Sequence, residues 1–338
     1  MDRCIISFKC NLLKGDQKTM VTLKIAPAEV RGFNYHPSYS TGALEDWLLF
    51  DEEVWRRELT NGKRLFPNTN TIRIWLSWNA YCRKGNDFIK SVRAAVEICR
   101  ELDMYVVPCL FNRWHDPMID CDGIYIDHFL PGSSWIQKFG DPFSDYIASL
   151  ADEFCNEERI LVWDVCNEPL AYGANFPLKE AVMPHEIAWL RRMTEQLRKC
   201  GVTQPIGVGS TGGQSMRVFE DIFDVYLTHM YYTGGSIAGF ETTVKMFADE
   251  AREDDRPLIC SECCWGSLDD RKRVDMMKVT LDMFQKYNIG FIAHALQYSG
   301  CADLHDPCDG RVTEDIGNLA FTLKDGSMRP YHELINAY

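Results

Sequence analysis

Two apolar stretches decide the fold: residues 104–111 read MYVVPCLF, and residues 160–166 read ILVWDVC. Neither stretch alternates polar with apolar residues, so both faces of each predicted strand are expected to be buried. Parallel strands covered by helices on both sides have this composition. Six more runs of similar length follow the same pattern, at residues 30–35, 71–76, 205–209, 225–230, 257–261 and 290–296.

Amphipathic stretches separate these runs. Apolar residues recur at steps of three or four within residues 87–103, 185–201 and 274–284, which predicts helices. Eight strands that alternate with helices over about 300 residues predict an α/β fold, a single (β/α)8 TIM barrel. An open, doubly wound sheet is the alternative, but no Gly-x-Gly-x-x-Gly motif follows the first run.

The domain organisation follows from the position of the first run. Residues 29–338 are expected to form the catalytic barrel, and residues 1–28 a short N-terminal hairpin that packs on it. Lys9, Lys14 and Asp16 interrupt the apolar start, which therefore lacks the layout of a signal peptide. We expect a cytoplasmic protein, or a secreted one if a signal peptide has been removed.

The net charge and the hydropathy of the chain limit the classes of partner that we expect. Of 338 residues, 36 are Lys or Arg and 49 are Asp or Glu, which gives a net charge of −13. An acidic chain has no basic surface for a phosphate backbone, so we expect no nucleic-acid partner. No apolar run approaches the roughly 18 residues of a transmembrane helix, so we expect no membrane partner either.

Two carboxylates stand at predicted strand ends, where the active site of a TIM barrel lies. Glu168 follows the run at 160–166, and Glu262 follows the run at 257–261. Retaining glycoside hydrolysis needs two carboxyl groups roughly 5 Å apart, one as the acid and one as the nucleophile. The two glutamates are therefore candidate catalytic residues.

The neighbours of each glutamate suggest which role it has. Glu168 stands beside Asn167 and is predicted to be the acid/base. Glu262 is predicted to be the nucleophile, kept ionised by Arg73 and hydrogen-bonded by Tyr231, because a cation and a phenol both favour the carboxylate form. A buried Arg73 also requires a nearby carboxylate partner.

These residues give the chain a resemblance to clan A glycoside hydrolases, closest in style to family 5, the cellulase and mannanase family. With the barrel, the resemblance spans about residues 29–300, and its motifs occur in the family's order: IRIW at 72–75, WDVCNEP at 163–169, THMYY at 228–232 and ICSE at 259–262. It implies a retaining mechanism without a metal or an organic cofactor.

The resemblance also implies roles for single residues. Asn167 would hold the 2-hydroxyl of the substrate, while Arg73, His229 and Tyr231 would shape the subsite of the reacting sugar. His115 resembles the family's histidine after the third strand, although its spacing is looser.

The eighth strand departs from the family pattern. The family places a Trp there as a floor for the reacting sugar, whereas this strand reads GFIAHALQYSG. His294, Gln297 or Tyr298 would have to fill that place, or Trp265 or Trp114 would supply the platform instead. Three tryptophans lie just past strand ends and are candidates for sugar contact: Trp78, Trp114 and Trp265.

The predicted function is hydrolysis of β-glycosidic bonds in an oligosaccharide or small glycoside by double displacement. A metal-dependent sugar isomerase or epimerase barrel is the first alternative, although Glu168 and Glu262 leave no obvious carboxylate–histidine set around one ion. A carbohydrate-binding barrel without catalysis is the second, and the presence of both glutamates disfavours it. The glycone, its linkage and the oligomeric state stay open.

Overall fold

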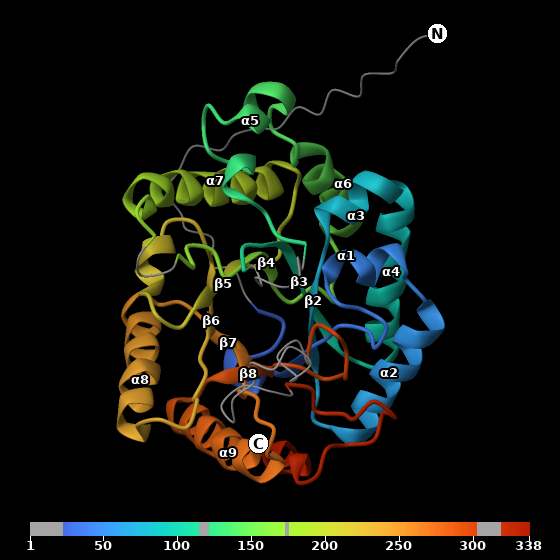
Figure 1. The fold of residues 1–338 in the computed structure, drawn as a ribbon, viewed down its shortest axis with the longest axis vertical. Coiled ribbons are helices and arrows are strands. Elements are labelled where there is room, and N and C mark those ends of the chain that lie inside the picture. The colour runs from blue at the N-terminus through green and yellow to red at the C-terminus, as the bar shows by residue number, and fades with distance from the viewer. Residues whose placement is uncertain (1–22, 115–121, 173–175, 303–318) are drawn as a thin grey trace.

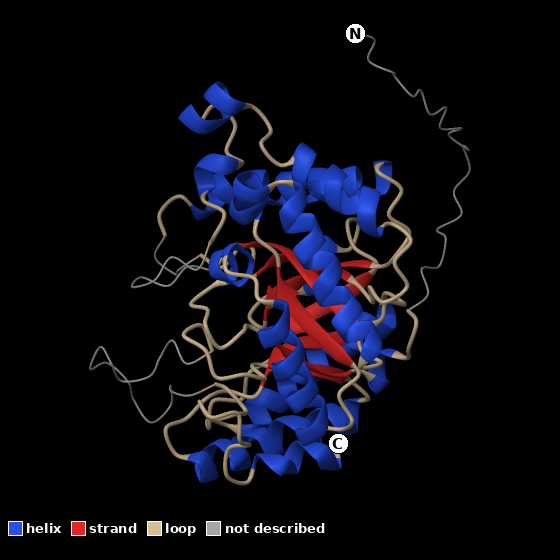
Figure 2. Cartoon of the chain, turned by 90° about the vertical axis from the view of Figure 1, so that its right-hand side faces the viewer, coloured by secondary structure: helices blue, strands red, loops and turns tan. Residues whose placement is uncertain are grey.

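The computed structural model describes residues 23–114, 122–172, 176–302 and 319–338. Its strands form one closed parallel barrel in sequence order, which confirms the predicted TIM barrel. The helices form a ring around the strands (Figure 1), and the strands lie at the centre of the molecule in the perpendicular view (Figure 2). The strands are β1 Arg31–Asn34, β2 Thr71–Trp75, β3 Tyr105–Asn112, β4 Trp163–Asn167, β5 Ile206–Thr211, β6 Val225–His229, β7 Leu258–Cys263 and β8 Gly290–Ala293.

Most of the described helices lie between consecutive strands along the chain, and some of these connections hold more than one helix. The loop after β3 holds a short helix that stands outside the main ring (Figure 1), in a region that the sequence suggested only as a long connection. The α-helices are α1 Ala43–Leu48, α2 Glu52–Leu65, α3 Trp78–Lys84, α4 Asn86–Glu101, α5 Ser134–Phe139, α6 Ser144–Phe154, α7 Lys179–Lys199, α8 Ile237–Glu253 and α9 Asp270–Tyr287. Short 3₁₀ helices are η1 Pro27–Glu29, η2 Ile126–His128, η3 Met216–Phe219 and η5 His332–Ala337.

Burial explains why the strand sequences do not alternate. All residues of β2 and β4 are buried, because one face packs inside the barrel and the other meets the helices. Each helix in turn buries one apolar stripe; in α4 this stripe includes Ile89, Val92 and Val96. Among the described helices, none is long and apolar enough to cross a membrane.

Apolar side chains fill the end of the barrel opposite the predicted catalytic end. Val30, Leu161 and Ile292 belong to this cluster, and Leu23 and Ile25 pack against it. The segment just before β1 therefore contacts the barrel. The rest of the predicted N-terminal hairpin lies outside the described residues.

The register of the barrel is irregular at its catalytic end. Between β4 and β5 it shifts from Asp164 to Asn167, and between β6 and β7 it shifts at His229. Such irregularities change the direction in which a strand-end side chain points. The strand β7 extends to Cys263, so that Glu262 lies inside the strand rather than after it.

Tight packing at the start of β8 gives a test of the barrel closure. A Cβ atom added at Gly290 would lie 2.0 Å from the carbonyl oxygen of Pro27. We expect Gly290→Ala to lower the free energy of unfolding by about 1–3 kcal/mol, because the backbone must move to relieve this clash. Denaturant unfolding of the purified variant measures this change.

The matched control is Gly239→Ala in α8, where the nearest atom to an added Cβ lies at 3.5 Å. In this helix the substitution should raise the free energy of unfolding by about 0.5–1 kcal/mol. Equal effects of the two substitutions would contradict the close approach of η1 to β8.

Candidate active site

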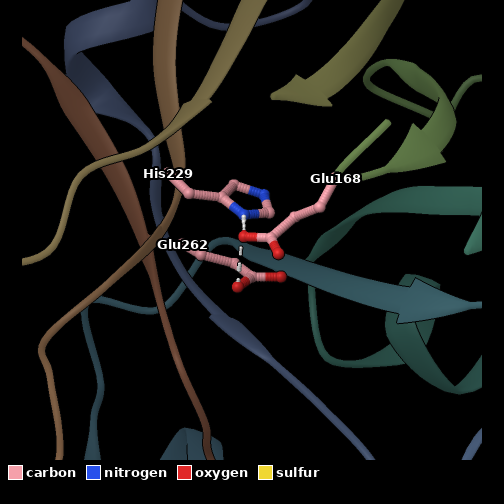
Figure 3. A group of neighbouring side chains, drawn as sticks. All are labelled: Glu168, His229 and Glu262. Carbon is pink, nitrogen blue, oxygen red and sulfur yellow. Dashed lines mark hydrogen bonds and ion pairs between the residues drawn. The ribbon is translucent and has the colours of Figure 1, made fainter. Parts of the chain in front are cut away.

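Three side chains meet at the mouth of the barrel (Figure 3). Glu168 follows β4, His229 ends β6, and Glu262 lies in β7. His229 Nδ1 is 2.8 Å from Glu168 Oε1 and 3.4 Å from Glu262 Oε2. One oxygen of each carboxylate and a ring nitrogen of His229 all lie within 4.8 Å of one another. The two predicted catalytic carboxylates are thus close together, although they are 94 positions apart in the sequence.

Glu262 is buried and held from two sides. Arg73 Nη1 lies 2.6 Å from Oε1, and the Tyr231 hydroxyl donates to Oε2 at 2.8 Å. Burial alone would raise the pKa of Glu262, but His229, Arg73 and His294, together with the Tyr231 hydrogen bond, lower that pKa to about 2. Glu262 is therefore an ionised carboxylate at neutral pH, as a nucleophile must be.

Arg73 is completely buried and connects four strands. Besides Glu262, its guanidinium donates to Asp164 Oδ2 at 2.9 Å, to Asn34 Oδ1 at 2.9 Å and to Asn167 Oδ1 at 2.8 Å. Burial lowers the pKa of Arg73, but Asp164 and its other neighbours outweigh this and raise it overall. The carboxylate partner predicted for Arg73 is therefore present twice, as Glu262 and as Asp164.

Glu168 has a different environment from Glu262. Its backbone has a left-handed φ of +48°, and its N–H donates to the Gly209 carbonyl at 2.7 Å. Its side chain is 16% exposed and is bonded to His229 rather than to an arginine. This turn directs the Glu168 carboxyl toward Glu262, while one side of the group stays open to the cavity.

A cavity of about 350 Å³ opens in front of the carboxylates. Seven predicted site residues line it, from the ends of β3, β4, β6, β7 and β8: Trp114, Asn167, Glu168, Tyr231, Glu262, Trp265 and His294. Arg73 and His229 are not in its lining and contact the carboxylates from behind. An apolar cavity with a few converging polar groups is the usual form of a small-molecule site.

Comparison with known proteins identifies the family. Residues 61–300 match the model of the family described as cellulase, glycosyl hydrolase family 5. The chain belongs to glycosyl hydrolase family 5. The resemblance seen in the strand-end motifs is thereby confirmed, and the cavity of this glycoside hydrolase is its candidate active site.

Solved structures share the fold. An exo-β-1,4-mannosidase from Opitutaceae bacterium strain TAV5 superposes with a TM-score of 0.71 at 17% identity, over 96% of this chain and 61% of that chain. β-Glucuronidase 2 of Bacteroides uniformis superposes with a TM-score of 0.65 at 17% identity, over 92% of this chain and 35% of that chain. The endo-1,4-β-mannanase of Rhizomucor miehei superposes with a TM-score of 0.60 at 17% identity, over 91% of this chain and 95% of that chain.

The family 5 chain thus spans about a third of the glucuronidase and three fifths of the mannosidase. At these identities the likeness concerns the fold. No curated protein sequence matches the chain.

Two more predicted residues, Trp78 and Gln297, are absent from the lining of the cavity. Trp78 begins α3, donates from Nε1 to the Pro142 carbonyl at 3.0 Å and packs against Phe143. Gln297 is buried beyond β8, where Thr322 donates to its side-chain oxygen at 3.2 Å. His115 lies outside the described residues. Trp78 and Gln297 therefore contact the interior of the fold rather than the space in front of the carboxylates.

Six lining residues were absent from the predicted site, and three of them are polar or aromatic: His36, Trp75 and Asn112. The rings of His36 and Trp75 are stacked, with centroids 4.5 Å apart, and Asn112 Oδ1 accepts a hydrogen bond from Asn167 Nδ2 at 2.9 Å. Each lies at or just past the C-terminal end of β1, β2 or β3. Their position at strand ends could have marked these residues as candidates in the sequence. That position alone does not show which strand-end side chains turn toward the cavity.

His294 is one of the three residues that the sequence offered in place of the family's tryptophan on the eighth strand. It lines the cavity, and its ring meets that of Trp75 edge-on with centroids 5.8 Å apart. Burial lowers the pKa of His294 to about 4; His36 and Arg73 add to this effect and Glu262 opposes it. His294 is therefore neutral at neutral pH and offers hydrogen bonds rather than a broad stacking surface. Trp75, Trp114 and Trp265 supply the aromatic surface of the cavity.

The structure corrects one sequence argument. The sequence suggested no carboxylate–histidine set around one ion, yet Glu168, His229 and Glu262 form such a set among the described residues. The barrel brings the ends of β4, β6 and β7 together, and sequence spacing cannot show this convergence. Arg73 already provides a positive charge at Glu262, and His229 bonds directly to Glu168.

The low pKa of Glu262 leads to a prediction about pH. Because this pKa lies below that of an unfolded glutamate, the ionised form stabilises the protein above pH ~4.3, and the contribution is lost as the pH falls toward about 2. Tyr231→Phe removes one hydrogen bond to the carboxylate. We expect the acidic limb of the kcat/KM profile to move up by about one pH unit.

Tyr232→Phe is the matched control, because the hydroxyl of this neighbouring tyrosine donates to the Gly235 carbonyl and not to Glu262. Its acidic limb should coincide with that of the parent enzyme. If the limb of Tyr231→Phe also coincides, the phenol does not hold the nucleophile in its ionised form.

Proposed function

We propose that this family 5 hydrolase is a retaining β-glycosidase that cleaves an oligosaccharide or a small glycoside by double displacement. One observation carries the proposal: an ionised, buried Glu262, bonded to Arg73, lies close to a more exposed Glu168, which is bonded to His229. Retaining enzymes need two carboxyl groups at short separation, whereas inverting enzymes leave a wider gap for a water molecule.

In the first step, a carboxylate oxygen of Glu262 attacks the anomeric carbon and forms a covalent bond to it. The bond from that carbon to the leaving oxygen breaks, and Glu168 donates its proton to this oxygen. The leaving group departs as an alcohol. The glycosyl unit remains as an ester on Glu262.

In the second step, Glu168 takes a proton from water, and the water oxygen attacks the anomeric carbon. The bond to Glu262 breaks and its carboxylate is released. The sugar leaves with the configuration it had in the substrate, since each step inverts the anomeric carbon once.

His229 supports the assignment of the acid. Two ionised carboxylates this close would repel each other unless charge nearby compensates them. Arg73 compensates Glu262, and Glu168 bonds to His229 Nδ1 on the more exposed side of the pair. Glu168 is therefore the better placed of the two carboxyl groups to exchange a proton with a bound ligand or with water.

The second candidate function is metal-dependent sugar isomerisation, and the set of Glu168, His229 and Glu262 is the observation that favours it. Carboxylate and imidazole groups are suitable ligands for a divalent cation. The hydrolase should work equally well in EDTA, whereas an isomerase would lose its activity.

The test uses a panel of aryl β-glycosides (glucoside, mannoside, galactoside, xyloside, glucuronide and N-acetylglucosaminide) with EDTA present. We expect the parent enzyme to turn over at least one of them, and Glu262→Gln to lose at least about 10³-fold in kcat. Glu168→Gln should still release an activated phenol in one burst and then stall, because water is no longer activated. NMR of the first-formed sugar should show the β-anomer.

Glu158→Gln is the control, since Glu158 is exposed and precedes β4 far from the cavity. It should match the parent enzyme on every substrate. An α-anomer as the first product, or activity seen only without EDTA, would overturn the proposal.

A further inference from the structure

A glutamate interrupts the buried apolar stripe of α7. Glu186 is fully buried in this stripe, together with Val182, Trp189, Leu190 and Met193. Residues at these spacings share one face of a helix, where an apolar side chain is the usual choice. Taking a carboxyl group out of water is costly unless it is hydrogen-bonded and paired with a cation. The partners of Glu186 must therefore offset this cost.

Three groups bond to Glu186, and two of them belong to the turn that follows β4. Its Oε1 atom accepts hydrogen bonds from the Leu170 N–H at 3.1 Å and from Arg113 Nε at 2.8 Å. Its Oε2 atom accepts a hydrogen bond from the Tyr172 hydroxyl. Because Leu170 and Tyr172 come two and four residues after Glu168, Glu186 fixes the short segment directly behind the proposed acid.

This turn has a disfavoured backbone conformation at two residues. The φ angle is +48° at Glu168 and +60° at Leu170, although both residues carry a side chain. Left-handed values are uncommon outside glycine, because the Cβ atom then approaches the backbone. Such a conformation persists only where the surrounding contacts hold it. Here the Glu168 N–H bonds to the Gly209 carbonyl, and the Leu170 N–H bonds to Glu186.

Arg113 forms a second connection between Glu186 and the proposed acid. Its side chain is buried, and Glu186 is its carboxylate partner at 2.8 Å. Its backbone N–H donates to the carbonyl of Asn167 at 2.9 Å, and Asn167 directly precedes Glu168. Through Arg113 and through Leu170, Glu186 is therefore linked to the chain on both sides of Glu168.

We infer that Glu186 is a positioning residue for Glu168: it holds the turn after β4 so that the Glu168 carboxyl reaches the glycosidic oxygen. This inference rests on the proposed glycosidase function, in which Glu168 is the acid/base. Glu186 does not line the catalytic cavity, so it acts through the turn and not on the substrate. A general acid must lie within hydrogen-bond reach of the oxygen that it protonates, so a small shift of this turn weakens protonation of the leaving group.

The test varies how much the leaving group needs a proton. A 2,4-dinitrophenolate is a stable anion and departs without protonation, whereas a phenolate departs slowly unless an acid protonates it. The two substrates are the dinitrophenyl and the phenyl β-glycoside of the sugar that the parent enzyme cleaves. The quantity measured is kcat/KM, because it includes the step in which the glycosidic bond breaks.

Two variants weaken the hold on the turn. Glu186→Gln keeps the shape of the side chain but removes the charge that pairs with Arg113. Its kcat/KM should fall about tenfold or more for the phenyl glycoside and change less than about twofold for the dinitrophenyl glycoside. Tyr172→Phe removes one hydrogen bond to Glu186, so it should show the same selectivity with a smaller loss, about threefold.

Glu250→Gln is the matched control. Glu250 is a buried glutamate of α8 that accepts a hydrogen bond from the Met216 N–H at 3.0 Å, and neither residue lines the cavity. The ratio of its two kcat/KM values should equal that of the parent enzyme. Glu168→Gln is the positive control, in which the phenyl glycoside should lose far more than the dinitrophenyl glycoside.

Equal losses on both substrates in Glu186→Gln and Tyr172→Phe would show a merely structural role and overturn the inference. Values like those of the parent enzyme in both variants would overturn it as well. If Glu186→Gln does not fold, Tyr172→Phe decides by itself. A parent enzyme inactive on every aryl glycoside, or a Glu168→Gln variant without this selectivity, would instead overturn the proposed function, and the inference with it.

Discussion

The guanidinium of Arg73, buried at the centre of the barrel mouth, is the constraint on which the site depends. An unpaired cation there would be very costly, so the groups around it have to be acceptors. They are Asn34, Asp164, Asn167 and Glu262, from β1, β4 and β7. The same cation thus joins strands across the barrel and keeps the proposed nucleophile ionised.

The space around this cation is correspondingly tight. A Cβ atom at Gly209 would lie 2.8 Å from Arg73 Nη2 and from Asp164 Oδ2, and 3.0 Å from His229 Nε2. β5 must therefore present a residue without a side chain at this point. The backbone of Gly209 also accepts the hydrogen bond from the Glu168 N–H, so it supports the proposed acid as well as the arginine network.

The residues of the candidate active site lie partly on strands and partly on loops. The carboxylates, Arg73 and His229 lie on or directly after strands, where the barrel ladder fixes them. His36, Trp114 and Trp265 lie on loops, which vary more easily without loss of the fold. The barrel strands therefore fix the carboxylates and their partners, whereas loops supply part of the lining of the cavity.

The sequence by itself determined the barrel and its two carboxylates. Short runs that are apolar on both faces favour covered parallel strands, and all eight were predicted within a few residues of their observed bounds. Glu168 and Glu262 were predictable because strand ends meet at one face of a barrel.

Only the tertiary structure decided which other strand-end side chains face the cavity. Trp75 turns inward while Trp78, three residues later, packs beneath the surface, and Asn112 bonds to Asn167 on the neighbouring strand. Local pattern does not encode these directions, because they depend on register shifts between neighbouring strands and on the path of each loop. The contact of His229 with both carboxylates arises in the same way, from three strands that are remote in sequence and converge at one end of the barrel.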